Sequence, residues 1–140
     1  MYTLSDEQKE FLLHGTRTAK IATVRKDGRP HVVPIWFVLD GNTLIFTMGD
    51  TSVKAFNMRR DARVTICVDD ETPPYSFIIV EGIAFLEKGS EELRLWATRI
   101  GSRYMGSDRA EEYGARNGTP EELLVRVTPT KVIFARDIAN

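Results

Sequence analysis

The chain has 140 residues, the usual size of one domain, and its 42% hydrophobic and 28% charged residues are typical of a globular protein. A net charge of −1 excludes a global positive field that would attract nucleic acid or an anionic membrane. The only cysteine, Cys67, excludes an internal disulfide and any CxxC motif. The charged N-terminus lacks the apolar core of a signal peptide, and no apolar run could span a bilayer. We expect one cytoplasmic domain over residues 1–140, with no nucleic-acid or membrane partner.

The N-terminal part predicts a short helix followed by a β meander. Ser5 and Gln8 fit a capping box at the helix start. Asp27-Gly28 and the segment 40–42 are turn signals that separate apolar, strand-like runs. The three predicted strands cover residues 18–25, 30–39 and 43–48.

The rest of the chain predicts further strands interrupted by helices. The stretch GDTSVKAFNMRRD, residues 49–61, predicts a helix capped by Asp50 or Thr51. Ser90 can cap a second helix, and a polar segment after it holds a short third one. Gly82 is a predicted bulge or bend point within a long strand. The predicted strands cover residues 62–70 and 75–87, with two more on either side of Thr128-Pro129.

Short connections between the predicted strands determine the fold class. Most are too short for a parallel crossover, so the sheet is mostly antiparallel. Closing such a sheet into a small barrel removes its exposed edges. We therefore expect a mainly β protein with flanking helices.

The sequence offers little catalytic machinery of its own. It has two histidines, no metal-binding spacing and no nucleophile elbow, so we expect no metal site and assign no catalytic residue. Cys67 lies within an apolar strand and is predicted to be a buried, unreactive thiol. Any catalysis would therefore depend on a bound organic cofactor.

Two stretches have both a structural and a binding interpretation. The free N–H groups of a helix starting near Thr51 attract anions, and Lys54 can reach a phosphate there, but many ordinary surface helices begin in the same way. Arg59 and Arg60 either balance the helix dipole or reach a second anionic group. Trp36, in PIWF, is either a core residue or a wall beside a flat ring.

Taken together, the segments ATVRKDGRPHVVP, TSVKAFNMRRDARV and VEGIA resemble the pyridoxamine 5′-phosphate oxidase-like proteins, over roughly residues 16–87. The resemblance implies an FMN-binding-type split β-barrel and a homodimer that holds two cofactors, either FMN or the deazaflavin coenzyme F420, at the subunit interface. The cofactor-binding residues that it implies are Val33, Pro34, Ile35, Trp36, Thr47, Met48, Thr51, Ser52, Val53, Lys54 and Arg60.

Details of the resemblance favour coenzyme F420. Lys54 matches the phosphate lysine, whereas Val53 stands where flavin oxidases of the family usually have arginine, so Arg60, Thr51 or a partner residue would replace that contact. The end of the sequence, FARDIAN, has no counterpart of the arginine segment used in vitamin B6 oxidation. The segments NMRRDARV and DGRPHVVP resemble those of the group assigned to coenzyme F420. That coenzyme carries a phosphodiester and an acidic tail. We expect hydride transfer between this coenzyme and a small unsaturated organic substrate. The alternatives are an FMN-dependent oxidoreductase and a non-catalytic flavin- or deazaflavin-binding or carrier protein.

Overall fold

The computed structural model describes residues 2–140 and contains one seven-stranded sheet in which every paired neighbour is antiparallel. The strand order is β2-β1-β5-β6-β7-β4-β3. The strands are β1 (Ala19–Val24), β2 (Pro30–Ile35), β3 (Val38–Asp40), β4 (Thr43–Gly49), β5 (Arg63–Asp70), β6 (Ser76–Lys88) and β7 (Glu122–Ala135). The predicted fold class, mainly β and antiparallel with flanking helices, is confirmed.

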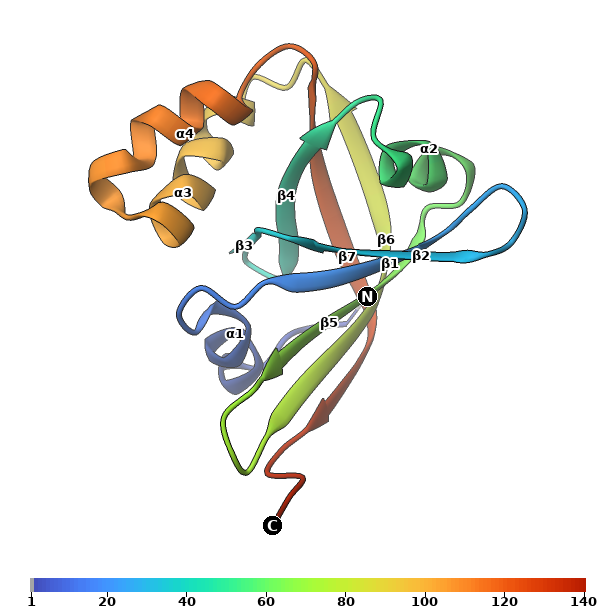
Figure 1. The fold of residues 1–140 in the computed structure, drawn as a ribbon, viewed down its shortest axis with the longest axis vertical. Coiled ribbons are helices and arrows are strands. Elements are labelled where there is room, and N and C mark those ends of the chain that lie inside the picture. The colour runs from blue at the N-terminus through green and yellow to red at the C-terminus, as the bar shows by residue number, and fades with distance from the viewer. Residues whose placement is uncertain (1) are drawn as a thin grey trace.

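The predicted strand 30–39 is interrupted, and this break shapes the whole sheet. Its first part, β2, pairs with β1 at one edge, whereas its second part, β3, pairs with β4 at the opposite edge. Only Trp36 and Phe37 lie between the two parts, so the chain draws the two edges together, and β2 and β3 run as one band across the molecule (Figure 1). The result is a split barrel, since no ladder joins β2 to β3 within the described chain.

Two long strands form the back of the barrel. The prediction of two C-terminal strands is wrong, because β7 continues through Thr128-Pro129 as one strand of 14 residues. The predicted irregularity at Gly82 is confirmed by a register shift between Glu81 and Gly82, but the extra residue is Thr130 of β7, between the partners Pro129 and Lys131. A side chain at Gly82 would meet the carbonyl oxygen of Thr128 at 2.7 Å, so the close approach of the strands requires glycine.

The interior of the barrel is filled by alternating side chains from nearly all strands, including Ile21, Phe46 and Ile66. A smaller cluster packs α3 onto the outer face of the sheet, through Trp96 against Leu124. Strand β4 is therefore buried on both faces, which explains the unbroken apolar run in TLIFTM.

The helices are α1 (Asp6–Leu13), α2 (Val53–Arg60), α3 (Leu93–Met105) and α4 (Ala110–Asn117), with a 3-10 turn at Ser107–Arg109. The Ser5–Gln8 capping box is present, as predicted. The other caps differ: Ser52 caps α2 by accepting from Ala55 N, and α3 begins after Glu92 rather than at Ser90. Figure 1 shows the α3–α4 hairpin on one side of β4 and α2 on the other. No helix in residues 2–140 is long and apolar enough to cross a membrane.

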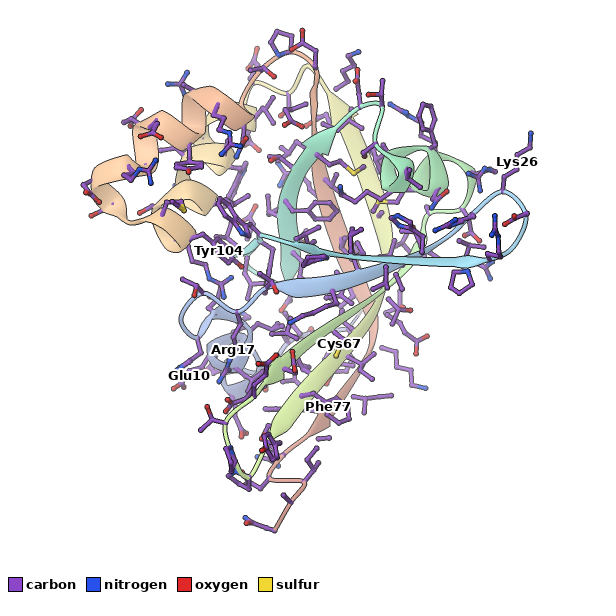
Figure 2. The ribbon with its side chains drawn as sticks, in the orientation of Figure 1. Glu10, Arg17, Lys26, Cys67, Phe77 and Tyr104 are labelled. Atoms are coloured by element: carbon purple, nitrogen blue, oxygen red, sulfur yellow. The ribbon has the colours of Figure 1, made fainter. Side chains whose placement is uncertain are left out.

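Two side chains of α3 stabilise the backbone at the break between β2 and β3. Phe37 has left the sheet ladder, and its N–H donates to Tyr104 Oη at 3.2 Å, while its carbonyl accepts from Arg103 Nη1 at 2.6 Å. The Tyr104 hydroxyl donates in turn to the carbonyl of Arg17 at 2.8 Å, and Figure 2 labels both residues, Tyr104 on the side of the α3–α4 hairpin and Arg17 on the side of α1. These contacts satisfy backbone groups that would otherwise be buried without partners.

The α3–α4 hairpin depends on small residues at its contact. A Cβ atom at Gly101 would lie 2.5 Å from Tyr113 Cβ, a distance that real contacts do not reach. We expect Gly101→Val to lower the free energy of unfolding by about 2 kcal/mol, because the helices must separate to admit the new side chain. Urea denaturation followed by circular dichroism measures this change. Ser102→Val adds valine to the same helix and is the matched control; an equal loss in both variants would contradict the close-packing explanation.

Candidate cofactor site

A groove of about 530 Å³ opens where the β2–β3 break, β4, the start of α2 and the α3–α4 hairpin meet. Each wall comes from a different part of the chain, so the groove exists only in the folded protein. Its lining residues are Pro34, Ile35, Trp36, Thr47, Lys54, Ile100, Arg116, Asn117 and Glu122.

Five of the eleven residues expected to bind the cofactor line this groove: Pro34, Ile35, Trp36, Thr47 and Lys54. Val33 packs against the barrel core instead, and Met48 is buried within it. Thr51 and Val53 are exposed at the start of α2, and Ser52 is its N-cap. Arg60 lies at the other end of α2, where its guanidinium donates to the Val24 carbonyl and to Asn57 Oδ1.

Lys54 is the second residue of α2 and places a cation in the groove at the start of this helix. Its ammonium is half-buried in the groove and makes neither a hydrogen bond nor an ion pair with any described residue. Burial lowers the pKa of Lys54, and the negative charge of Glu122 opposes that shift. The N–H groups of Val53 and Lys54 likewise have no partner within residues 2–140. An unpaired ammonium on the first turn of a helix whose N–H groups are also unpaired suits an anionic ligand.

Glu122, at the start of β7, was not predicted as a site residue. Its Oε2 atom is buried and has no hydrogen-bond partner among the described residues. Burial raises the pKa of Glu122, whereas the nearby Lys54 charge lowers it. The groove thus contains a carboxylate as well as an ammonium, and the two groups interact without forming an ion pair.

Trp36 is the aromatic residue of the groove lining, and two tyrosines pack against it. Trp36 is stacked on Tyr104, with ring centroids 5.0 Å apart and planes only 5° from parallel, and Tyr113 lies 5.8 Å from Trp36 at a tilt. Trp36 is partly buried and lines the groove, so it serves both the packing of α3 and the groove wall. Stacking fixes the orientation of its ring.

Three other lining residues, Ile100, Arg116 and Asn117, were also missed. Ile100 comes from the apolar stripe of α3, and the other two come from the end of α4. Arg116 is exposed and lies over the Tyr113 ring, with its guanidinium carbon 5.3 Å from the centroid. Only the position of Ile100 in the α3 stripe was visible in the sequence, because no motif connects the α4 segment to a cofactor.

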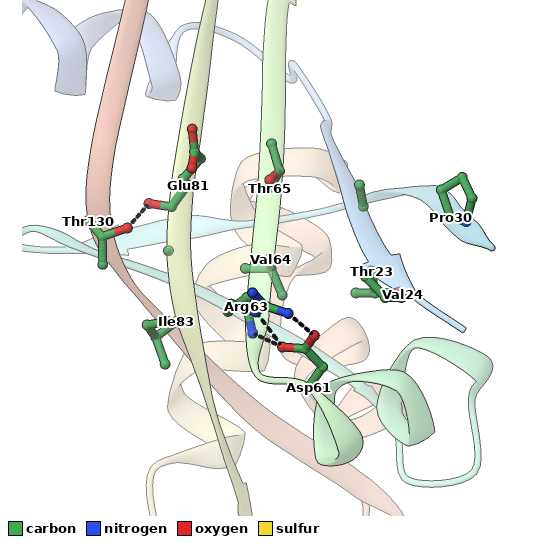
Figure 3. A pocket seen from close by; sticks show the side chains of 12 residues that line it. Thr23, Val24, Pro30, Asp61, Arg63, Val64, Thr65, Glu81, Ile83 and Thr130 are labelled. Carbon is green, nitrogen blue, oxygen red and sulfur yellow. Dashed lines mark hydrogen bonds and ion pairs between the residues drawn. The ribbon is translucent and has the colours of Figure 1, made fainter. Parts of the chain in front are cut away.

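A second hollow, of about 350 Å³, lies on the outer face of β1, β5 and β6 (Figure 3). Its cation, Arg63, is already paired: its guanidinium donates to Asp61 at 2.7 and 2.9 Å. This pairing lowers the pKa of Asp61 to about 2. Glu81 adds a further carboxylate to the lining, so this hollow lacks the unpaired cation that makes the larger groove suitable for a phosphate.

The cysteine gives no reactive centre. Cys67 is only partly buried on the outer face of β5, contrary to the prediction that it is buried. Burial still raises the pKa of its thiol, and the negative charge of Asp69 adds to this effect. The protonated thiol is a poor nucleophile.

The family model named pyridoxamine 5′-phosphate oxidase matches residues 4–136, so the chain belongs to that family. A conserved hypothetical protein from Mycobacterium tuberculosis superposes with a TM-score of 0.83 at 24% identity, covering 98% of this chain and 89% of that one. A protein described as an F420 reductase superposes with a TM-score of 0.74 at 26% identity, covering 89% and 94%.

Other structures of this fold carry different descriptions. The haem storage protein HutZ of Vibrio cholerae superposes with a TM-score of 0.73 at 20% identity, covering 96% of both chains. At that identity the likeness establishes the fold alone. The site residues, rather than the fold, must therefore support any more specific function.

Proposed function

We propose that this protein is an oxidoreductase that uses coenzyme F420 and transfers hydride between the deazaflavin and a small unsaturated organic substrate. The observation that carries the proposal is the half-buried, unpaired Lys54 ammonium in a groove whose other wall is the fixed ring of Trp36. Membership of the family supports it, and so does the likeness to a protein described as an F420 reductase.

The residues of the groove fit a phosphate-bearing ring cofactor in distinct ways. Lys54 and the unpaired N–H groups at the start of α2 would bind the phosphate. The strand end at Pro34 and Ile35, together with Trp36, would orient the ring and exclude water from one of its faces. The cofactor supplies the hydride chemistry when bound, so the protein needs no nucleophile of its own.

Two alternatives remain for the same groove. FMN also combines a flat ring with a phosphate, and the family model is named after an oxidase. A non-catalytic binding or carrier protein is the second alternative, because the split-barrel fold also occurs in a protein described as storing haem. Val53, exposed where a second phosphate contact would be expected, favours coenzyme F420 over FMN.

The absorption spectrum of the purified protein and its turnover separate these functions. We expect a protein without a bound flavin spectrum that binds added coenzyme F420 and oxidises its reduced form in the presence of an activated alkene acceptor. A yellow protein with a flavin spectrum would instead support the FMN-dependent enzyme. Saturable binding without turnover of any acceptor would support the carrier.

We propose further that the protein is a homodimer that shares its cofactor grooves. Large apolar side chains are exposed on β2 and β6: Val32 is 64% and Phe85 is 67% accessible. A second copy covering them would explain their exposure. We expect sedimentation equilibrium to show a dimer at micromolar concentration and Phe85→Asp to shift it toward monomer. Ile138→Asp, at another exposed apolar position, is the control; a wild-type monomer would contradict the proposal.

A further inference from the structure

Three charged residues line the groove. Lys54 and the exposed Arg116 are its cations, and Glu122 places a carboxylate among them. The neighbouring acids lie outside the groove lining, where Asp50 pairs with Lys88 at 2.7 Å and Glu121 is exposed, but the charges of both add to the raised pKa of Glu122. Val53 contributes no charge. Glu122 is therefore the one acidic residue in the groove lining.

Glu122 is held in place close to the start of α2. Its backbone N–H donates to the Thr119 carbonyl at 2.9 Å, and the residue pairs with Gly49 at the end of β4. The carboxylate lies beside Gly49, since a Cβ atom built there would be in ordinary van der Waals contact with Oε2, at 4.0 Å. Only three residues separate Gly49 from the first residue of α2, so this charge opposes an anion bound at the helix start.

We propose that Glu122 selects the charge of the bound phosphate, favouring a singly charged phosphodiester over a doubly charged phosphomonoester. This inference rests on the proposed function of the same groove. A phosphomonoester carries a charge of about −1.5 to −2 at pH 7, whereas a diester carries a single charge. Each additional ligand charge is attracted by Lys54 and repelled by Glu122, so the carboxylate cancels much of the benefit of the second charge.

The unpaired Oε2 atom is what makes this selection effective. A carboxylate that accepted a hydrogen bond from the protein would have part of its charge neutralised, but no described residue donates to this atom. A buried charge is also screened less by solvent and salt than an exposed one. In addition, an ionised carboxylate can only accept hydrogen bonds, so it offers no donor to a phosphate oxygen.

The test uses two probes that differ in phosphate charge and by one methyl group: the 5′-phosphate of the ribityl deazaflavin, and its monomethyl phosphodiester. Calorimetric titration gives the affinity of each probe for the wild-type protein and for Glu122→Gln, which removes the charge but keeps the shape. We expect Glu122→Gln to shift the affinity ratio about tenfold toward the monoester, which is the effect of one unit charge in a partly solvated groove.

Three comparisons decide the outcome. Glu121→Gln, which removes the adjacent exposed carboxylate, should leave the wild-type ratio unchanged. Glu122→Asp, which keeps the charge, should retain the preference for the diester, and thermal melting of each variant checks that it is folded. An unchanged ratio in Glu122→Gln would overturn the charge selection alone. If neither probe binds the wild-type protein, the proposed function and the charge selection both fall.

Discussion

Lys54→Ala is expected to weaken cofactor binding by about 1.5–3 kcal/mol, which is the usual loss when a hydrogen bond to a charged group is removed. This corresponds to a roughly 10- to 150-fold higher dissociation constant. The ammonium is half-buried and has no partner among residues 2–140, so its interaction with the ligand replaces no existing contact. Fluorescence titration with coenzyme F420 measures the change.

A lysine outside the groove provides the control. Lys131 is exposed on β7, nine residues beyond Glu122 in an extended strand. Lys131→Ala removes the same charge and should leave the dissociation constant within about twofold, because solvent and salt screen a charge at that distance. Equal effects of the two substitutions would show that Lys54 acts only through net charge and would contradict a phosphate contact.

Arg103→Ala is expected to lower the free energy of unfolding by about 4 kcal/mol, one of the larger losses for a single substitution. Its guanidinium donates to the carbonyls of Leu12, Gly15 and Phe37 at 2.6–3.0 Å, which joins α3 to the end of α1 and to the β2–β3 break. Alanine would leave these acceptors without their charged donor. Thermal melting should show a decrease of more than about 10 °C.

Arg99→Ala is the matched control on the same helix. Arg99 is exposed and lies over Trp96, with its guanidinium carbon 4.8 Å from the ring centroid, so its loss should cost less than about 1 kcal/mol. If Arg103→Ala melts at the same temperature as Arg99→Ala, the contacts of Arg103 with the three carbonyls contribute little to stability.

The sequence predicted the elements whose signals are local. The Ser5–Gln8 capping box appears as predicted, since both side chains act within one helical turn. The Asp27-Gly28 turn closes the β1–β2 hairpin, with Gly28 at a φ of 89° that glycine adopts readily. Gly82 lies at the register shift between β6 and β7, where the two strands approach too closely for any side chain.

The break at Trp36 and Phe37 had no local signal. Both residues are apolar and favour strands, so the run 30–39 looked continuous. What interrupts it is long-range: Tyr104 and Arg103, more than sixty positions further along, take over the backbone groups of Phe37. The long-range contacts of α3 therefore determined the local structure, contrary to the local preference.

The candidate site likewise contains some residues that the sequence predicted and others that it did not. Residues expected in the groove from the family pattern lie on the first half of the chain, and Trp36, Thr47 and Lys54 do meet there. Arg116 and Glu122 lie in the last third, where the resemblance is weakest. Glu122 reaches the groove because β7 pairs with β4, a contact between residues more than seventy positions apart that no single sequence reveals.

The position of the cofactor is tested most directly through the fluorescence of Trp36. The chain has two tryptophans, so Trp96→Phe leaves Trp36 as the only one. We expect coenzyme F420 to quench this emission to a plateau at one molecule per chain, and Lys54→Ala to move the curve to higher concentration. Unchanged Trp36 emission, at concentrations where equilibrium dialysis shows the coenzyme to be bound, would place the cofactor outside this groove and contradict the account.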